Sequence, residues 1–148
     1  MQGRSRRRGF ALVKLLLAIT LVGLVLGSSL SGVRALAGSA ELASAARVAR
    51  GHLAYGRVVA IARRDAVTLT LNASGELVLA DASGSVIRRT PLLGSAGFRL
   101  DSIRLRPRIL RFNARGHAAP GSLYLHNGPA GVRLVVNFLG RVRVEPLP

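Results

Sequence analysis

The chain is organised around residues 9–26, GFALVKLLLAITLVGLVL, which follow a basic cluster in residues 4–8. As a helix rising about 1.5 Å per residue, residues 10–30 would span about 30 Å, the thickness of a bilayer's hydrocarbon core. The positive-inside rule places the basic cluster on the cytoplasmic side and the chain after about Leu30 on the other. Lys14 lies near the cytoplasmic end, where its long stem reaches the interface. The sequence therefore predicts a membrane-entering helix.

Two ordinary export mechanisms fit this stretch. A cleaved secretory signal would use Arg4–Lys14 as its basic region, Leu15–Leu26 as its apolar core and Ala35–Ala37 as its small-residue cleavage site. The remainder would then be a soluble exported protein. An uncleaved signal anchor would instead keep the helix in the membrane. The apolar stretch alone leaves both open.

The composition is strongly basic, with a formal net charge of +16 and Lys14 as the only lysine. Arginine pairs with phosphate and carboxylate through a planar fork, so anionic lipids, nucleic acids and acidic protein surfaces are the partner classes. Genomic base composition explains an arginine-, alanine- and glycine-rich chain equally well. The absence of cysteine excludes disulfides and thiol chemistry, so an exported domain depends on its apolar core.

The sequence predicts one long helix over Phe10–Arg64, because this range lacks proline and is rich in Ala, Leu, Val and Arg. Residues 31–64 form its amphipathic half. One face at helical spacing carries Leu42, Ala45, Ala46, Ala49, Leu53, Gly56 and Ala60, and we expect it to pack on the following domain. A basic stripe of Arg47, Arg50, Arg57 and Arg64 is most simply a solvated face, with a phosphate or partner contact as the alternative.

From residue 65 onward the period changes to two, which predicts a β-rich domain. Strands are expected at residues 66–71, 76–80, 85–89, 98–105, 109–113, 122–126, 132–138 and 141–145. Turns are expected at residues 72–75, 81–84, 113–116, 127–129 and 139–140. The predicted fold class is α+β, with a long N-terminal helix packed on an antiparallel β domain over residues 65–148.

The junction RRRGFALVKLLL resembles the leader junction of type IV prepilins and pseudopilins. The resemblance implies that residues 1–9 form a basic leader ending in Gly9, that the prepilin peptidase cuts before Phe10, and that Phe10 is then methylated. Residues 10–30 become the transmembrane half of the helix. The fifth mature residue of that family is usually Glu, whereas this chain has Lys14. A like charge near a neighbour's terminal amine repels it, so the usual docking interaction is in doubt.

The carboxyl-terminal half resembles the β domain of the GspH/FimT-like minor pseudopilins. The resemblance rests on FNARG at residues 112–116, GSLYL at 121–125, RLVVN at 133–137 and GRVRV at 140–144, and the arginine-rich helix end fits as well. Such proteins lie in the inner membrane, with the domain in the periplasm, and assemble with other pseudopilins through their helices. In type II secretion this pseudopilus is thought to push folded proteins through the outer membrane.

An alternative function follows from the same family. FimT-like type IV pilus subunits are implicated in DNA uptake, and their Gly-Arg-x-Arg pattern is present as Gly140, Arg141, Val142 and Arg143. Arg141 and Arg143 would grip successive phosphates, in a binding mode weakened by salt. A solvated edge that discourages strand aggregation explains the same arginines.

The residues offer no catalytic constellation. The six acids, Glu41, Asp65, Glu76, Asp81, Asp101 and Glu145, show no paired spacing, and His52, His117 and His126 show no metal-ligand spacing. No nucleophile-elbow sequence occurs. We therefore expect a non-enzyme that uses no cofactor and no metal.

Overall fold

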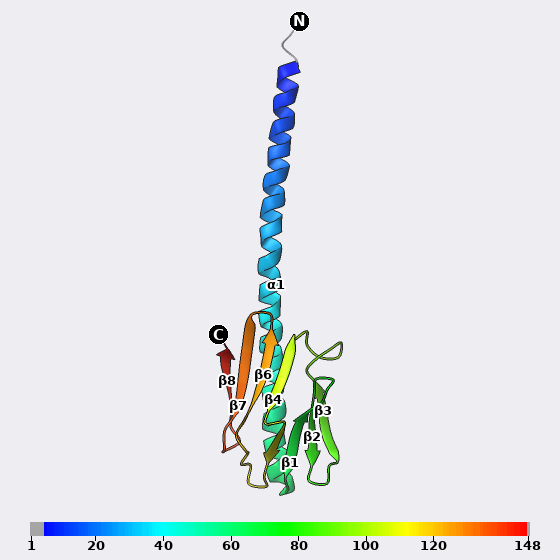
Figure 1. The fold of residues 1–148 in the computed structure, drawn as a ribbon, viewed down its shortest axis with the longest axis vertical. Helices are drawn as coiled ribbons and strands as arrows, with labels where there is room; N and C mark the ends of the chain where they lie inside the picture. The colour runs from blue at the N-terminus through cyan, green and yellow to red at the C-terminus, as the bar shows by residue number, and fades with distance from the viewer. Residues whose placement is uncertain (1–4, 148) are drawn as a thin grey trace. The chain divides into compact units, whose positions relative to one another are not determined.

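The computed structural model describes the backbone of residues 5–147 and the side chains of residues 13–24 and 37–147. Its first element is the helix α1, Ser5–Arg63 (Figure 1). The chain divides into two compact units, Met1–Ala37 and Gly38–Pro148. We call the second unit the head. The predicted cleavage and methylation residues, Gly9 and Phe10, lie where no side chain is described, so that prediction stays untested.

The large apolar residues of α1 between Val13 and Leu24 are each more than half exposed. Within the residues that the structure describes, no helix combines the length and the apolar character needed to cross a membrane.

The head combines the carboxyl-terminal part of α1 with eight strands in two four-stranded sheets (Figure 1). The strands are β1 (Val67–Leu71), β2 (Glu76–Asp81), β3 (Val86–Pro91), β4 (Ser102–Arg106), β5 (Ile109–Phe112), β6 (Gly121–Asn127), β7 (Ala130–Val136) and β8 (Val142–Leu147). One sheet has the order β3-β2-β1-β5 and the other β4-β6-β7-β8, with all neighbours antiparallel. The α+β class and the eight strands are confirmed.

Most strand ends differ from the sequence prediction by one or two residues, and two of the differences move an aromatic residue out of its predicted strand. β4 begins at Ser102 rather than at Phe98, because Phe98 forms an isolated bridge with Leu93 in the preceding loop. β7 ends at Val136 instead of residue 138, so Phe138 lies in the following turn and is 61% exposed. Alternation alone does not reveal where a strand gives way to a turn.

The predicted apolar face of α1 is the face that packs on the sheets. All its members are buried, and Gly56 makes the closest approach: a Cβ there would lie 2.8 Å from the Leu79 Cδ1. A larger residue at position 56 would require the Leu79 side chain to shift, so glycine lets the helix pack closely on the β3-β2-β1-β5 sheet. The largest core side chains are Leu53, Leu69, Leu77, Leu79, Leu92, Leu110, Phe112, Leu123, Leu125 and Leu134.

Four turns in the head share one design. Each begins with Asn or Asp and has a glycine with positive φ three residues later, at Gly75, Gly84, Gly116 and Gly140. In each, the glycine N–H donates to the backbone carbonyl of that Asn or Asp at 2.8–3.1 Å. The side-chain oxygen of the Asn or Asp accepts the N–H of the residue after the glycine. Three of these turns join the paired strands β1–β2, β2–β3 and β7–β8 and fix their register, whereas the turn at residues 113–116 follows β5 and leads to the other sheet.

Helix α1 ends in a Schellman motif. The Asp65 N–H donates to the Ala60 carbonyl and the Arg64 N–H to the Ile61 carbonyl, both at 3.2 Å. This ending requires a left-handed residue after the helix, and Arg64 supplies it with φ 52°. The chain thereby turns directly into β1.

Candidate functional site

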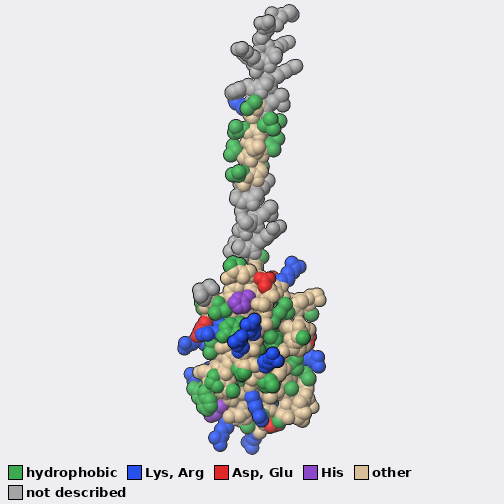
Figure 2. All heavy atoms as spheres, in the orientation of Figure 1, with side chains coloured by type: hydrophobic (Ala, Val, Ile, Leu, Met, Phe, Trp, Pro, Cys, Tyr) green, Lys and Arg blue, Asp and Glu red, His purple; other side chains and the backbone are tan. Residues whose placement is uncertain are grey.

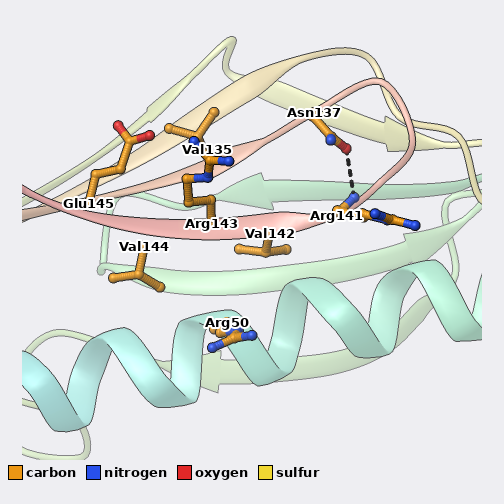
Figure 3. Close-up of a pocket in the computed structure, with 8 residues that line it drawn as sticks. All are labelled: Arg50, Val135, Asn137, Arg141, Val142, Arg143, Val144 and Glu145. Atoms are coloured by element: carbon orange, nitrogen blue, oxygen red, sulfur yellow. Dashed lines mark hydrogen bonds between the residues drawn. The ribbon is translucent and has the colours of Figure 1, made fainter.

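The predicted Gly-Arg-x-Arg residues lie where the β7–β8 turn runs into β8. Asn137 opens the turn, and its Oδ1 accepts the N–H of Arg141 at 2.9 Å (Figure 3). Arg141 therefore precedes β8 and closes the turn, whereas Arg143 lies within the strand. Figure 3 shows the Arg141 side chain extending along the end of the hairpin, away from Arg143, which rises beside Val135.

Among the strands that the structure describes, β8 pairs with β7 on one side, and its other edge has no strand partner. A hollow of about 660 Å³ surrounds this edge, which we call the β8 edge site. Its lining residues are Arg50, Val135, Asn137, Arg141, Val142, Arg143, Val144 and Glu145. In Figure 3, Val142 and Val144 point toward α1, while Arg143 and Glu145 point to the opposite side of the strand.

Arg50 also lines the β8 edge site, although the sequence predicted only Arg141 and Arg143 as possible DNA-binding residues. It belongs to the arginine stripe on α1, and it faces the hollow from below β8 (Figure 3). Arg50 and Arg143 thus border the free edge from its two sides. The seven-residue spacing of the arginine stripe indicated that Arg50 lies on one face of the helix with other arginines. Its proximity to β8 could not be predicted, because it depends on how β8 packs beside the helix in the folded head.

The charge of the β8 edge site is positive. Glu145 is its one acid, and this carboxylate is held by Arg133 on β7, with 2.7 Å from Nη2 to Oε2 and 3.2 Å from Nε to Oε2. In the part of the chain whose side chains are described, Arg50, Arg141 and Arg143 lie within ion-pair distance of no carboxylate. Three guanidinium groups therefore remain available to an anion.

A different member of the arginine stripe holds the turns in place. Arg57 Nε donates to the Gly116 carbonyl at 3.2 Å. Gly116 and Gly140 meet at this point, because a Cβ on Gly140 would lie 2.3 Å from the Gly116 oxygen and 2.9 Å from the Arg57 Cδ. Arg57 is half-buried, so it is not part of a solvated stripe. It fixes the turn that presents Arg141.

The six acids all take part in structural contacts. Glu41 accepts the Arg99 N–H at 2.7 Å, Asp65 caps Ala66, and Asp101 accepts the Gly128 N–H. Glu76 accepts from Asn72, Asp81 accepts from Ser83 and Ser85, and Glu145 binds Arg133. The hydroxyl of Ser83 is the main cause that lowers the pKa of Asp81. Among the described residues, no three His, Asp or Glu side chains gather as metal ligands.

The three histidines are dispersed. His117 stacks on Phe138 with ring centroids 5.0 Å apart, and His126 lies on the outer face of β6. His52 is 3% exposed, and its Nδ1 lies 2.8 Å from the Thr90 Oγ1 on β3. Its Nε2 is buried without a hydrogen-bond partner. Burial, assisted by the nearby Arg88, lowers the pKa of His52 to about 4, so this imidazole is neutral at neutral pH.

The fold and the head have known relatives. The structure is similar to two crystal structures of the type IV minor pilin FimU from Pseudomonas aeruginosa, with TM-scores of 0.57 and 0.56 and 25% sequence identity in both. The first similarity covers 73% of this chain and 90% of FimU, and the second covers 71% and 93%. A search of curated proteins finds no match.

These similarities define a class of pilin-like proteins, in which a helix packs on an antiparallel β head. The family model described as type II transport protein GspH matches residues 40–140, which is most of the head including the β8 turn. The chain therefore belongs to the GspH family, whose pseudopilins and minor pilins are structural proteins that assemble with other pilins.

Proposed function

We propose that this chain is a structural minor pseudopilin of a type II secretion system, and not an enzyme. The observation that carries the proposal is the match of the GspH family model to residues 40–140, together with the α+β architecture of the head. The prepilin peptidase removes residues 1–9, and Phe10 becomes the methylated amino terminus. Helix α1 then anchors the protein in the inner membrane with the head in the periplasm.

The exposed apolar side chains of α1 support assembly through the helix. The large apolar side chains between Val13 and Leu24 are each more than half exposed, and such a surface is stabilised when lipid or other helices surround it. The resulting filament contains this chain as one subunit among other pseudopilins.

The second candidate is a type IV pilus subunit that binds DNA, and the β8 edge site favours it. Three guanidinium groups without carboxylate partners border a strand edge, so a phosphate backbone lying along β8 would contact Arg50, Arg141 and Arg143. The similarity to the type IV minor pilin FimU supports a role in a type IV pilus as the alternative to type II secretion.

One deletion experiment separates the candidates. Removing the chain from its native cell is expected to abolish export of folded type II cargo while natural transformation continues. Loss of transformation with normal secretion would establish the second candidate and overturn the first. Unchanged secretion and transformation, with the head recovered from the periplasm lacking residues 1–37, would favour a soluble exported protein.

A further inference from the structure

The sheet β4-β6-β7-β8 carries a second basic surface on the side away from its core. Strand register places Arg104, Tyr124, Arg133 and Glu145 in one row across the four strands. Beside this row lies a hollow of about 380 Å³ lined by Ser102, Arg104, Arg106, Tyr124 and His126, which we call the basic hollow. Figure 2 shows several Arg side chains and few acids on the visible face of the head, which contains no lysine.

The basic hollow contains unneutralised charge. Arg104 and Arg106 are exposed, and within the described part of the chain neither lies within ion-pair distance of a carboxylate. They alternate on β4, so their side chains share one face at a spacing of about 6.8 Å. Arg108 does not extend this face, because β4 ends at Arg106. The hollow therefore offers two neighbouring guanidinium forks with hydroxyl and imidazole groups around them.

The basic hollow is separate from the β8 edge site. Strands β4 and β8 are the two outermost strands of the sheet, about 14 Å apart at ordinary strand spacing. The row from Arg104 on β4 to Glu145 on β8 contains the Arg133–Glu145 ion pair, which neutralises the positive charge at its β7–β8 end. A long polyanion binds best to a continuous row of positive side chains. The guanidinium groups of Arg104 and Arg106 form only a short positive patch, which is better matched to one or two carboxylates. The Arg133–Glu145 pair shows on the same sheet face how a carboxylate is held there.

A second copy of this chain does not fit the basic hollow. The head contains sixteen arginines and six acids, a formal charge of +10, so two heads repel each other. All six acids are already engaged within the head. The carboxylates must come from a different protein.

Taking these observations together, and resting on the proposed function, we infer that the basic hollow binds an acidic segment on the head of a different pilin-like subunit. Arg104 and Arg106 pair with two carboxylates of that subunit, and Tyr124, Ser102 and His126 supply hydrogen bonds around them. The positive charge of the head then determines which subunits lie next to it in the filament. This subunit binds subunits with acidic heads and does not bind a second copy of itself.

The test uses the full-length protein in its native membrane, with the photocrosslinking amino acid p-benzoylphenylalanine in place of Tyr124. We expect an adduct with another pilin-like subunit whose crosslinked segment contains at least two Asp or Glu residues. Arg104→Glu with Arg106→Glu should reduce this adduct at least tenfold. Arg89→Glu, at an exposed position on β3 of the other sheet, should leave it unchanged.

A charge swap completes the experiment. Replacing the two partner acids by arginine should restore the adduct in the Arg104→Glu, Arg106→Glu protein. An adduct between two copies of this chain, an adduct with nucleic acid, or an adduct insensitive to both substitutions would overturn the inference.

A parallel crosslinker at Val22 on α1 separates this inference from the proposed function. Adducts at Val22 without adducts at Tyr124 would contradict the inference that the basic hollow binds another subunit, and they would leave the proposed pseudopilin function intact. Adducts at neither position would overturn both.

Discussion

Arg57 on α1 donates a hydrogen bond across 59 residues to the carbonyl of Gly116, and the turn containing Gly140 closes over this contact. The end of the helix and two β turns thus meet at one point of the head. The position of Arg141, and through it the start of β8, depends on this meeting of helix and turns.

Substitution of Gly140 should therefore damage the head more than substitution of a comparable glycine. In Gly140→Ala the new Cβ would lie 2.3 Å from the Gly116 oxygen and would also suffer the positive φ of 69°. We expect a loss of about 2–4 kcal/mol in the free energy of unfolding. Urea unfolding of the full-length chain in detergent, followed by the fluorescence of Tyr55 and Tyr124, measures it.

Gly84→Ala is the matched control for Gly140→Ala. Gly84 has φ 88°, but a Cβ there meets no atom within 4 Å, so only the backbone strain remains, about 1 kcal/mol. Equal losses for the two variants would show that the contact between the turns does not stabilise the head.

Arg64 is expected to be a suboptimal helix cap. It takes the left-handed position of the Schellman motif with φ 52°, and its side chain is exposed. Arg64→Gly should raise the free energy of unfolding by about 0.5–1 kcal/mol, because glycine adopts this conformation without the Cβ penalty. The same urea titration detects it, and a destabilised Arg64→Gly protein would mean that the arginine side chain contributes to the fold.

His52 should make the head less stable in weak acid. Its pKa falls from 6.5 to about 4 on folding, so the unfolded chain binds the extra proton between these values and stability decreases as the pH drops below 6.5. The expected loss is about 1.4 kcal/mol for each pH unit at the steepest part. The positive charge of Arg88 adds to the cost of charging the His52 ring.

His52→Asn isolates this effect, because an amide can still bond the Thr90 hydroxyl but does not titrate. The variant should lose some stability at all pH values and show a flatter dependence between pH 6.5 and pH 4. A slope equal to that of the unmodified protein would assign the pH dependence to other groups.

The β8 edge site makes a prediction for the second candidate function. If the full-length chain binds double-stranded DNA, Arg50→Gln should weaken binding about as much as Arg143→Gln, and each should reduce the salt slope by about one. Fluorescence anisotropy at several salt concentrations gives both values. Arg89→Gln is the control at an exposed position on the other sheet. If DNA binding depends on Arg143 but not on Arg50, helix α1 does not contribute to DNA binding at the β8 edge site.

The fold was largely predictable from the sequence because its signals are local. The apolar spacing of α1 predicted the buried face from Leu42 to Ala60, and the Asx-x-x-Gly turns separated most of the strands. The site was less predictable because its residues meet through long-range contacts. Arg50 joins Arg143 only where β8 lies beside α1, and Arg57 differs from its stripe neighbours only through Gly116. His52 is buried by β3, which no helical pattern reveals.

The measurement that tests the pseudopilin proposal most directly is the amino-terminal mass of the protein from its native membrane, with and without the prepilin peptidase. The account predicts a mature chain that begins at methylated Phe10, and an unprocessed chain in cells lacking the peptidase. A chain that begins at Gly38 in both cells would contradict it, because the helix would then be a discarded signal and the head a free periplasmic protein.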